Sequence, residues 1–246
     1  MTKSIAACAI CIWATSTFCQ TLPEPAATPA ALAPLSHDGQ TLNPAWRLSG
    51  LPNNKAPLSR FVWQAQGNLA HLQLLTDNSY GVLSHPWQGA APQVLAWRWQ
   101  LVRPLPVADI ATKAGDDAAI KVCVMFDQPM SDIPFLQRAT LSLARAVTGQ
   151  DLPSATLCYL WDSRYPAGTV QVNPYTARVR SIVLNGREAA LGQWISQRRR
   201  IADDFLQLFG SESLTLPPVV AIAIGADSDN TQAHSAAGLA DLRTLP

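Results

Sequence analysis

Charged residues are scarce in this sequence. Only 14% of its 246 residues carry charge, compared with about 25% in an average globular protein, and the net charge is +1. This balance provides no electrostatic basis for binding nucleic acid or an acidic membrane surface, so neither is expected as a partner. The hydrophobic content of 48% is ample for a packed core and excludes a chain that is disordered throughout.

Motifs of well-known catalytic and metal sites are also missing. The sequence contains no GxSxG elbow, no HExxH motif and no phosphate-binding loop. Its CxxC pair, Cys8 and Cys11, falls in an apolar N-terminal segment. The histidines lack the spacing of a zinc site, and we expect them at the surface or in loops: His37, His71, His85 and His234.

No segment is apolar over the roughly 20 residues that a membrane-spanning helix needs. The apolar run Ile5–Ala14 follows Lys3 and precedes small or polar residues, which is typical of a signal peptide. We therefore expect a signal peptide over residues 1–19, cleaved after Cys19, and a periplasmic or secreted protein without a transmembrane segment. Acylation of Cys19 in a lipoprotein is the alternative.

Only two cysteines, Cys123 and Cys158, follow the predicted signal peptide. An oxidising compartment permits a disulfide between them without requiring one. Both could equally be small core residues.

Residues 20–36 are rich in proline and alanine and predict an extended linker. The rest, residues 37–246, predicts a single mainly β domain with the strand spacing of a sandwich or barrel. The clearest strands are Val94–Val102, Ala118–Asp127, Ala155–Asp162, Arg178–Leu184 and Val219–Ala226, and weaker ones are Arg60–Gln66, Leu69–Thr76, Tyr80–Ser84 and Glu188–Ser196.

Two short helices interrupt these strands. The first begins near Ser131 or Asp132 and ends at Gly149. The second spans Arg200–Phe209 and should bury Ile201, Phe205 and Leu208. The first helix has an apolar stripe, formed by Phe135, Leu136, Ala139, Leu143 and Val147.

Alternation along the strands separates apolar from basic residues. Arg98, Lys121 and Arg180 each lie on the face of a strand opposite its most apolar side chains. If the three strands share a sheet, these cations form one basic face, which needs anionic partners wherever it is covered.

Two acidic runs flank predicted strands. Lys113, Asp116 and Asp117 precede one strand, and Asp227, Asp229 and Asn230 follow another, so we expect the carboxylates to converge at one end of the sandwich. Three interpretations stay open. The runs cap turns and strand ends, or Asp116, Asp117, Asp227 and Asp229 hold a divalent cation such as Ca²⁺, or they supply catalytic acids and bases. An EF-hand is excluded, because Gln232 and Gly238 occupy the positions of its glycine and glutamate.

A series of short motifs resembles an exported bacterial family, domain of unknown function 3047. The motifs lie in order between residues 43 and 241: Trp97-Arg98-Trp99, Lys113-Ala114-Gly115-Asp116-Asp117, Phe126-Asp127, Tyr159-Leu160-Trp161, Asn173-Pro174-Tyr175, Leu191-Gly192-Gln193-Trp194 and Asp229-Asn230-Thr231. The resemblance implies a Gram-negative periplasmic or secreted protein with an antiparallel β-sandwich of jelly-roll or galactose-binding-like type. It implies no activity, cofactor or catalytic residue. The chain departs from the pattern at Lys121, Cys158 and the closing stretch Ala237–Asp241.

Three functions follow from this reading. The favoured one is a binding module for a glycan or another envelope polymer, in which Arg98, Lys121, Arg180, Asp116 and Asp229 face the ligand, with Lys113, Asp117 and Asn230 close by. The second is a polysaccharide lyase or hydrolase using Asp116, Asp117 or Asp229. The third is a purely structural envelope protein, since a sandwich accommodates all three.

Overall fold

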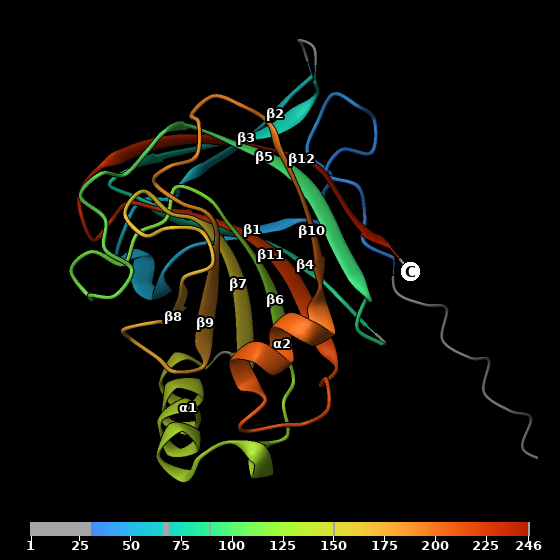
Figure 1. Ribbon diagram of the computed structural model, residues 1–246, viewed down its shortest axis with the longest axis vertical. Helices are drawn as coiled ribbons and strands as arrows, with labels where there is room; N and C mark the ends of the chain where they lie inside the picture. The colour runs from blue at the N-terminus through green and yellow to red at the C-terminus, as the bar shows by residue number, and fades with distance from the viewer. Residues whose placement is uncertain (1–30, 66–68, 89, 150, 246) are drawn as a thin grey trace, which may run out of the picture.

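The computed structural model describes residues 31–65, 69–88, 90–149 and 151–245. These residues form twelve strands in two sheets and two α-helices, both helices lying toward the same end of the molecule (Figure 1). The predicted mainly β sandwich is therefore confirmed. The predicted signal peptide and most of the predicted linker lie outside the described residues.

The larger sheet has seven strands in the order β1-β4-β11-β6-β7-β9-β8. Its strands are β1 (Arg47–Ser49), β4 (Tyr80–Pro86), β6 (Lys121–Phe126), β7 (Ala155–Trp161), β8 (Val170–Val172), β9 (Val179–Asn185) and β11 (Val219–Asp227). All neighbours are antiparallel except β7 and β9, which are parallel. The prediction of a wholly antiparallel sandwich is wrong for this pair, because residues 162–178 return the chain to the start of β7 before β9 begins.

The smaller sheet has five strands in the order β10-β5-β12-β3-β2. Its strands are β2 (Arg60–Gln64), β3 (His71–Asp77), β5 (Val94–Arg103), β10 (Ile195–Arg200) and β12 (His234–Leu245). The sequence did not predict β12, and the predicted strand Glu188–Ser196 is mostly turn ahead of β10. Small residues in β12 serve close packing, since a Cβ added at Gly238 would lie 3.0 Å from the Trp194 ring.

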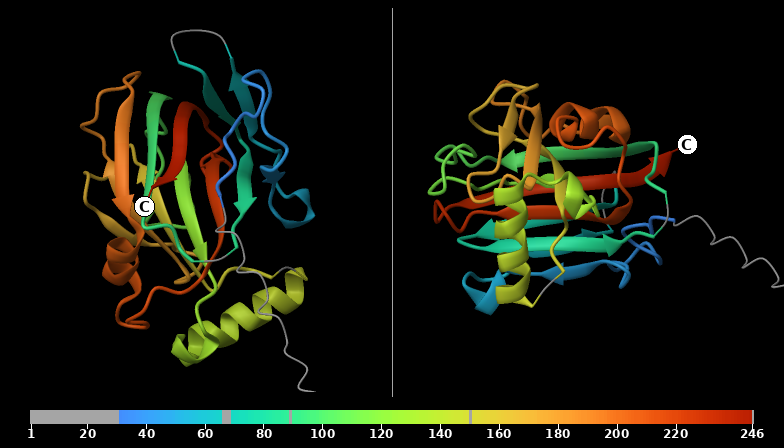
Figure 2. Two further views of the ribbon diagram at one scale, coloured as in Figure 1. Left: turned by 90° about the vertical axis from the view of Figure 1, so that its right-hand side faces the viewer. Right: turned by 90° about the horizontal axis from the view of Figure 1, so that it is seen from below.

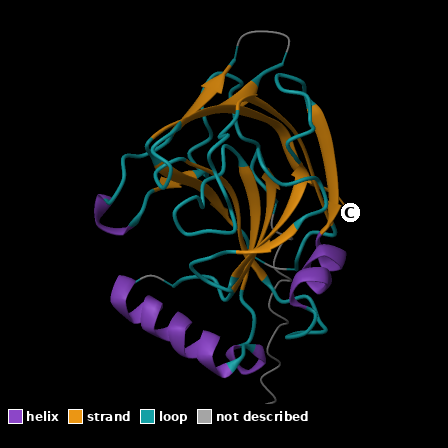
Figure 3. Ribbon diagram, turned by 60° about the vertical axis from the view of Figure 1, so that its left-hand side comes forward, coloured by secondary structure: helices purple, strands orange, loops and turns teal. Residues whose placement is uncertain are grey.

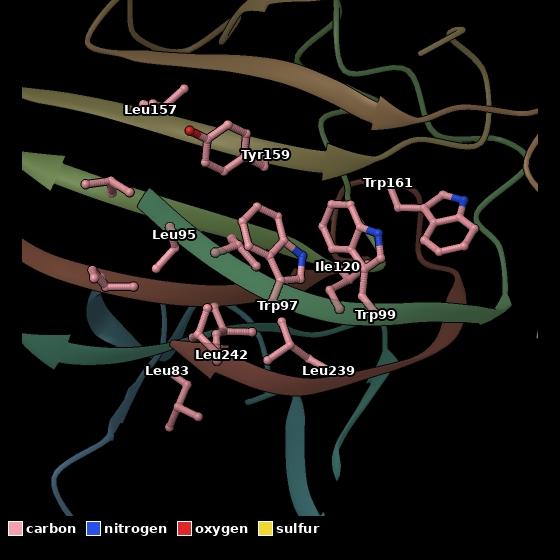
Figure 4. Packing of buried hydrophobic residues seen from close by; sticks show 14 of the residues in the cluster. Leu83, Leu95, Trp97, Trp99, Ile120, Leu157, Tyr159, Trp161, Leu239 and Leu242 are labelled. Atoms are coloured by element: carbon pink, nitrogen blue, oxygen red, sulfur yellow. The ribbon is translucent and has the colours of Figure 1, made fainter. Parts of the chain in front are cut away.

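Aromatic side chains fill the space between the sheets (Figure 4). Trp97 and Trp99 of β5 face Tyr159 and Trp161 of β7, with ring centroids 5.3 Å apart for Trp97–Tyr159 and 6.0 Å for Trp99–Trp161. All four side chains are buried. These tryptophans are core residues and do not form a platform for a sugar.

The folded domain begins earlier than predicted. Leu35 is 5% exposed, and Trp46 donates through Nε1 to the Ala33 carbonyl at 3.1 Å. His85 is buried rather than at the surface, since the Trp46 ring packs 5.3 Å from it, and its Nε2 accepts from the Ala33 N–H at 3.2 Å. Residues 33–36 thus belong to the sandwich and not to the predicted linker.

The helices are α1 (Phe135–Thr148) and α2 (Ile201–Phe209), with short 3-10 turns η1 (Pro52–Asn54) and η2 (Met130–Asp132) (Figure 3). Helix α2 buries Ile201, Phe205 and Leu208 against the core, as predicted. Helix α1 buries only Leu141 and ends at Gly149, whose φ of 64° suits glycine. Among the described residues, no helix is long and apolar enough to cross a membrane.

Candidate functional site

A pocket of about 600 Å³ lies on the outer face of the seven-stranded sheet. Alternation along β6 explains its position, because Val122 and Val124 point into the core between the sheets. Lys121 and Cys123 point the other way and line the pocket. The strands thus supply an apolar floor, and the loops at their ends supply a polar rim.

The floor contains a disulfide between Cys123 of β6 and Cys158 of β7. The two residues are direct partners in the β6–β7 register, with Cα atoms 4.1 Å apart and an S–S distance of 2.08 Å. Leu160 and Ala223 pack beside it in the same apolar cluster. The bridge therefore fixes two strands of the pocket floor to one another.

The predicted acidic runs meet at one end of this pocket. Asp117 precedes β6 and Asp227 ends β11, and these strands are antiparallel neighbours, so the two residues lie side by side. Carboxylate oxygens of Asp117, Asp227 and Asp229 lie within 4.8 Å of one another. Asp116 lines the same pocket.

Asp117 binds the loop that carries Asp229. It is 1% exposed, and its carboxylate accepts from the backbone N–H groups of Asn230 at 3.1 Å and Thr231 at 2.7 Å. The Thr231 hydroxyl donates to it at 2.5 Å. Three donors therefore offset its charge, which is the turn-capping role considered from the sequence.

Lys121 offsets the charge of Asp227. Its Nζ lies 2.7 Å from Asp227 Oδ2, while the Ala118 N–H donates to Oδ1 at 2.9 Å. Burial raises the pKa of Asp227 from 3.8 to about 6, despite the opposing effect of Lys121. Burial also opposes the charge of Lys121, but the Asp227 carboxylate raises the pKa of this ammonium above its ordinary value.

Gly225 makes the Lys121–Asp227 pair sterically feasible. Lys121 and Gly225 are partners in the β6–β11 register, and the lysine stem lies over the glycine. A Cβ added at Gly225 would lie 2.6 Å from Lys121 Cε. The glycine thus leaves room for a side chain that lies along the sheet surface.

A second set of contacts joins three loops at the rim. Asn173 donates to Asp116 Oδ2 at 2.6 Å, and Asn230 donates to the Lys113 carbonyl at 2.6 Å. The Tyr175 hydroxyl donates to the same carbonyl at 2.9 Å, and the Lys113 ammonium lies 5.4 Å from the centre of the Tyr175 ring. Lys113 therefore organises the rim chiefly through its backbone.

Asp116 and Asp229 have the least compensated carboxylates of the pocket. Burial raises the pKa of both above the ordinary value of 3.8. Among the described residues, Asp229 Oδ1 is buried and has no hydrogen-bond partner. A buried acceptor without a donor calls for an explanation, and a bound hydroxyl or amine would provide one.

The predicted basic face does not exist. Arg98 belongs to β5 in the other sheet, where it pairs with Asp241 at 2.5 Å. Arg180 shares the larger sheet with Lys121 but is in register with Leu157, a core residue, and therefore points to the opposite face. The prediction was wrong because alternation defines the faces of each strand but not which strands pair.

Arg180 has a structural role. Together with Arg178 it binds Glu212, and its guanidinium lies 4.2 Å from the centre of the Phe209 ring. Glu212 is buried by these contacts, with 6% of its side chain exposed. The two arginines thus tie β9 to the loop after α2, away from the pocket.

Among the pocket residues that sequence reasoning missed are Tyr80, Asn173 and Tyr175. Asn173 and Tyr175 belong to one of the motifs, but nothing in their spacing connects them with Asp116. Tyr80 begins β4 and lies against Lys121, whose Nζ is 5.7 Å from the ring centre. No local sequence pattern predicts such contacts between segments far apart in sequence.

The carboxylate triad is also the group that could hold a cation. Asp117, Asp227 and Asp229 offer oxygen ligands of the kind that Ca²⁺ prefers. The Lys121 ammonium, bound to Asp227, would repel a divalent ion at this position. The cation site therefore stays a prediction.

In a comparison with family models, residues 44–243 match "Protein of unknown function (DUF3047)". The chain belongs to this family. The match spans every strand of both sheets except the last residues of β12. No curated protein matches the DUF3047 chain.

Several solved structures are similar to this DUF3047 protein in outline. The carbohydrate-binding module TmCBM61, solved with beta-1,4-galactotriose, is 11% identical with a TM-score of 0.34, covering 85% of this chain and 91% of that one. The xyloglucanase domain of NopAA from Sinorhizobium fredii, solved with cellobiose, is 10% identical with a TM-score of 0.42, covering 81% and 92%. The catalytic domain of Humicola grisea Cel12A is 11% identical with a TM-score of 0.42, covering 82% and 92%. Likenesses this distant carry no argument about the site.

Proposed function

We propose that this DUF3047 protein is an exported envelope protein that binds a glycan in the pocket of its seven-stranded sheet. The observation that carries the proposal is the convergence of polar groups on a cavity of about 600 Å³. Ligand pockets range from roughly 300 to 1,000 Å³, with apolar walls and a few placed polar groups. This pocket has that composition, and its volume suits a short saccharide.

The polar end of the pocket offers both kinds of hydrogen-bonding group. Asp116 and Asp229 can accept from sugar hydroxyls, the second N–H of the Asn173 amide can donate, and the Asn230 amide oxygen can accept. The apolar floor around the disulfide suits the C–H face of a pyranose ring. Tyr80, beside Lys121, adds an aromatic edge to the pocket.

The carboxylates favour binding over catalysis. Acid–base pairs work when the environment moves the two pKa values apart, so that one group is protonated and the other ionised. Here burial raises the pKa of both Asp116 and Asp229. The alternative, a lyase or hydrolase, is tested by asking whether the purified protein cleaves an oligosaccharide that it binds.

Export is proposed from the N-terminal pattern, in which Lys3 precedes a short apolar run. The bridge between Cys123 and Cys158 supports an oxidising compartment such as the periplasm. Intact-mass measurement of protein recovered from the periplasmic fraction tests this part. A new N-terminus at Gln20 supports it, and a retained Met1 contradicts it.

The binding test is a thermal-shift screen of the purified protein against envelope oligosaccharides, followed by calorimetry on those that raise the melting temperature. Asp229→Asn should weaken binding at least tenfold, because a hydrogen bond to a charged group contributes about 1.5–3 kcal/mol. Asp241→Asn, on the other sheet, is the control and should bind normally. The proposal fails if no saccharide binds, or if the two variants bind equally well.

A Ca²⁺ titration and a chelator belong in the same screen. A rise in melting temperature with Ca²⁺ that Asp227→Asn abolishes would establish the predicted cation site. An unchanged melting temperature would eliminate it without affecting the glycan proposal, because the two readouts are independent.

A further inference from the structure

Helix α1 presents its apolar side to solvent. The stripe of Phe135, Leu136, Ala139, Leu143 and Val147 lies on its exposed side, and the four larger side chains are 71%, 77%, 65% and 77% exposed in chain order. A helix on a globular protein ordinarily turns such a stripe toward the core. In α1 the arrangement is reversed.

Polar contacts fix this reversed orientation. Arg145 donates through Nε to the Leu152 carbonyl at 2.9 Å and lies 3.5 Å from Asp151. Gln137 accepts from Arg178 of the sandwich at 2.8 Å. Because both polar residues lie on the side of α1 that meets the body, the stripe must face away from it.

We propose that this stripe docks α1 onto the surface of a lipid bilayer, with its apolar side chains inserted at the interface. The stripe combines an aromatic and branched aliphatic residues, and α1 contains no acidic residue, only Arg138 and Arg145. An apolar helix face without acidic residues suits the boundary between headgroups and acyl chains. The inference goes beyond glycan binding and does not depend on it.

The size of the stripe favours a bilayer over a second copy of the chain. Side chains of this kind expose on the order of 500 Å² together. A stable protein interface buries about 800 Å² on each partner. The stripe alone is too small for that, whereas shallow insertion into a membrane requires no matching surface.

The position of α1 also suits a bilayer. The helix projects from one end of the sandwich, where neither sheet extends past it (Figure 2). Leu152 and Pro153, which lie shortly after the end of α1, line the pocket. Docking through α1 therefore holds the pocket next to the membrane surface, within reach of an envelope polymer.

Cosedimentation with vesicles tests the proposal. Protein recovered from the periplasmic fraction, with its N-terminus established by mass, is mixed with vesicles of phosphatidylcholine and, separately, of phosphatidylethanolamine with phosphatidylglycerol. The variant Leu136→Gln/Leu143→Gln should lower the partition coefficient at least tenfold on both vesicles, since insertion depends on apolar area. The matched control is Val102→Gln/Val107→Gln, at positions 53% and 62% exposed elsewhere on the surface.

Three results would overturn the proposal. The first is that the protein does not sediment with either vesicle, and the second is that the α1 variant and the control sediment alike. The third is that light scattering finds a dimer in the wild type and a monomer in the α1 variant. The last result would assign the stripe to a second copy. Glutamine is a good helix former and both leucines are exposed, so the variants should fold, and far-ultraviolet circular dichroism checks that they do.

Discussion

Lys121→Met tests whether the ammonium of Lys121 neutralises the acidic end of the pocket. The change keeps most of the stem and removes the charge 2.7 Å from Asp227, which is only 4% exposed. Removing one partner of a buried ion pair typically costs about 3–5 kcal/mol. Protonation of Asp227 limits this loss, because its pKa in the folded protein is already about 6 and neutralising the carboxyl at pH 7 costs only about 1.4 kcal/mol.

We therefore expect Lys121→Met to lose about 2–3 kcal/mol of unfolding free energy at pH 7, from this protonation and the lost hydrogen bond. The loss should be smaller at pH 5, where wild-type Asp227, with its pKa of about 6, is itself mostly protonated. The sign follows from the raised pKa of Asp227: without its cation the folded state binds the proton more tightly than the unfolded chain, so lower pH restores stability.

Urea denaturation followed by tryptophan fluorescence, at pH 7 and pH 5, measures both quantities. Lys121→Met/Asp227→Asn should recover most of the loss, since the remaining groups are neutral. Lys113→Met, an exposed lysine of the same region, is the control and should stay within about 0.5 kcal/mol of wild type. A loss below about 1 kcal/mol, or one that does not change with pH, would refute the reasoning.

Three further predictions concern the same pocket. Replacing Cys123 and Cys158 by alanine should cost about 4 kcal/mol, from the entropy of a loop closed over 35 residues, and urea denaturation with and without reductant would show no difference if this is wrong. Gly225→Ala should cost about 1–3 kcal/mol, because its Cβ would lie 2.6 Å from the Lys121 stem, and an unchanged melting temperature would contradict it. Asp229→Asn should gain stability relative to wild type as pH rises above about 4, because burial raises the pKa of this carboxyl. A difference in melting temperature that stays constant from pH 4 to pH 8 would count against that cause.

Period-two alternation predicted the faces of individual strands well. Val122 and Val124 are fully buried between the sheets, and Lys121 and Cys123 lie on the opposite face. This pattern is local, because neighbouring side chains in a strand must point to opposite sides. It needs no knowledge of which strands are paired.

Convergence of the acidic runs was also foreseeable. Asp117 stands just before a strand and Asp227 at the end of another, so any antiparallel pairing of those strands brings the two together. The basic face failed because it required three strands to share a sheet and a side. Arg98 lies in the other sheet, and Arg180 shares the sheet of Lys121 but points to its opposite face.

Strand β12 shows a different limit of sequence reasoning. Its centre, Ala236–Ala240, consists mostly of small residues with low β-propensity. It is nevertheless central in its sheet, between β5 and β3, because packing selects small residues there. The contact of Gly238 with Trp194 exists only in the folded chain and leaves no local signal.

Helix α1 shows how far an amphipathic pattern can be taken. The pattern predicts a helix with two unlike faces, and α1 has them, but it does not determine which face meets the body. Leaving Leu136, Leu143 and two similar side chains exposed forgoes about 1.5–3 kcal/mol for each. The hydrogen bonds of Gln137 and Arg145 contribute only about 0.5–1.5 kcal/mol each, or somewhat more where charged. The free energy that burial of these side chains would release thus exceeds that of the hydrogen bonds, and insertion into a bilayer can release it. The reversed helix therefore indicates a docking surface rather than a packing defect.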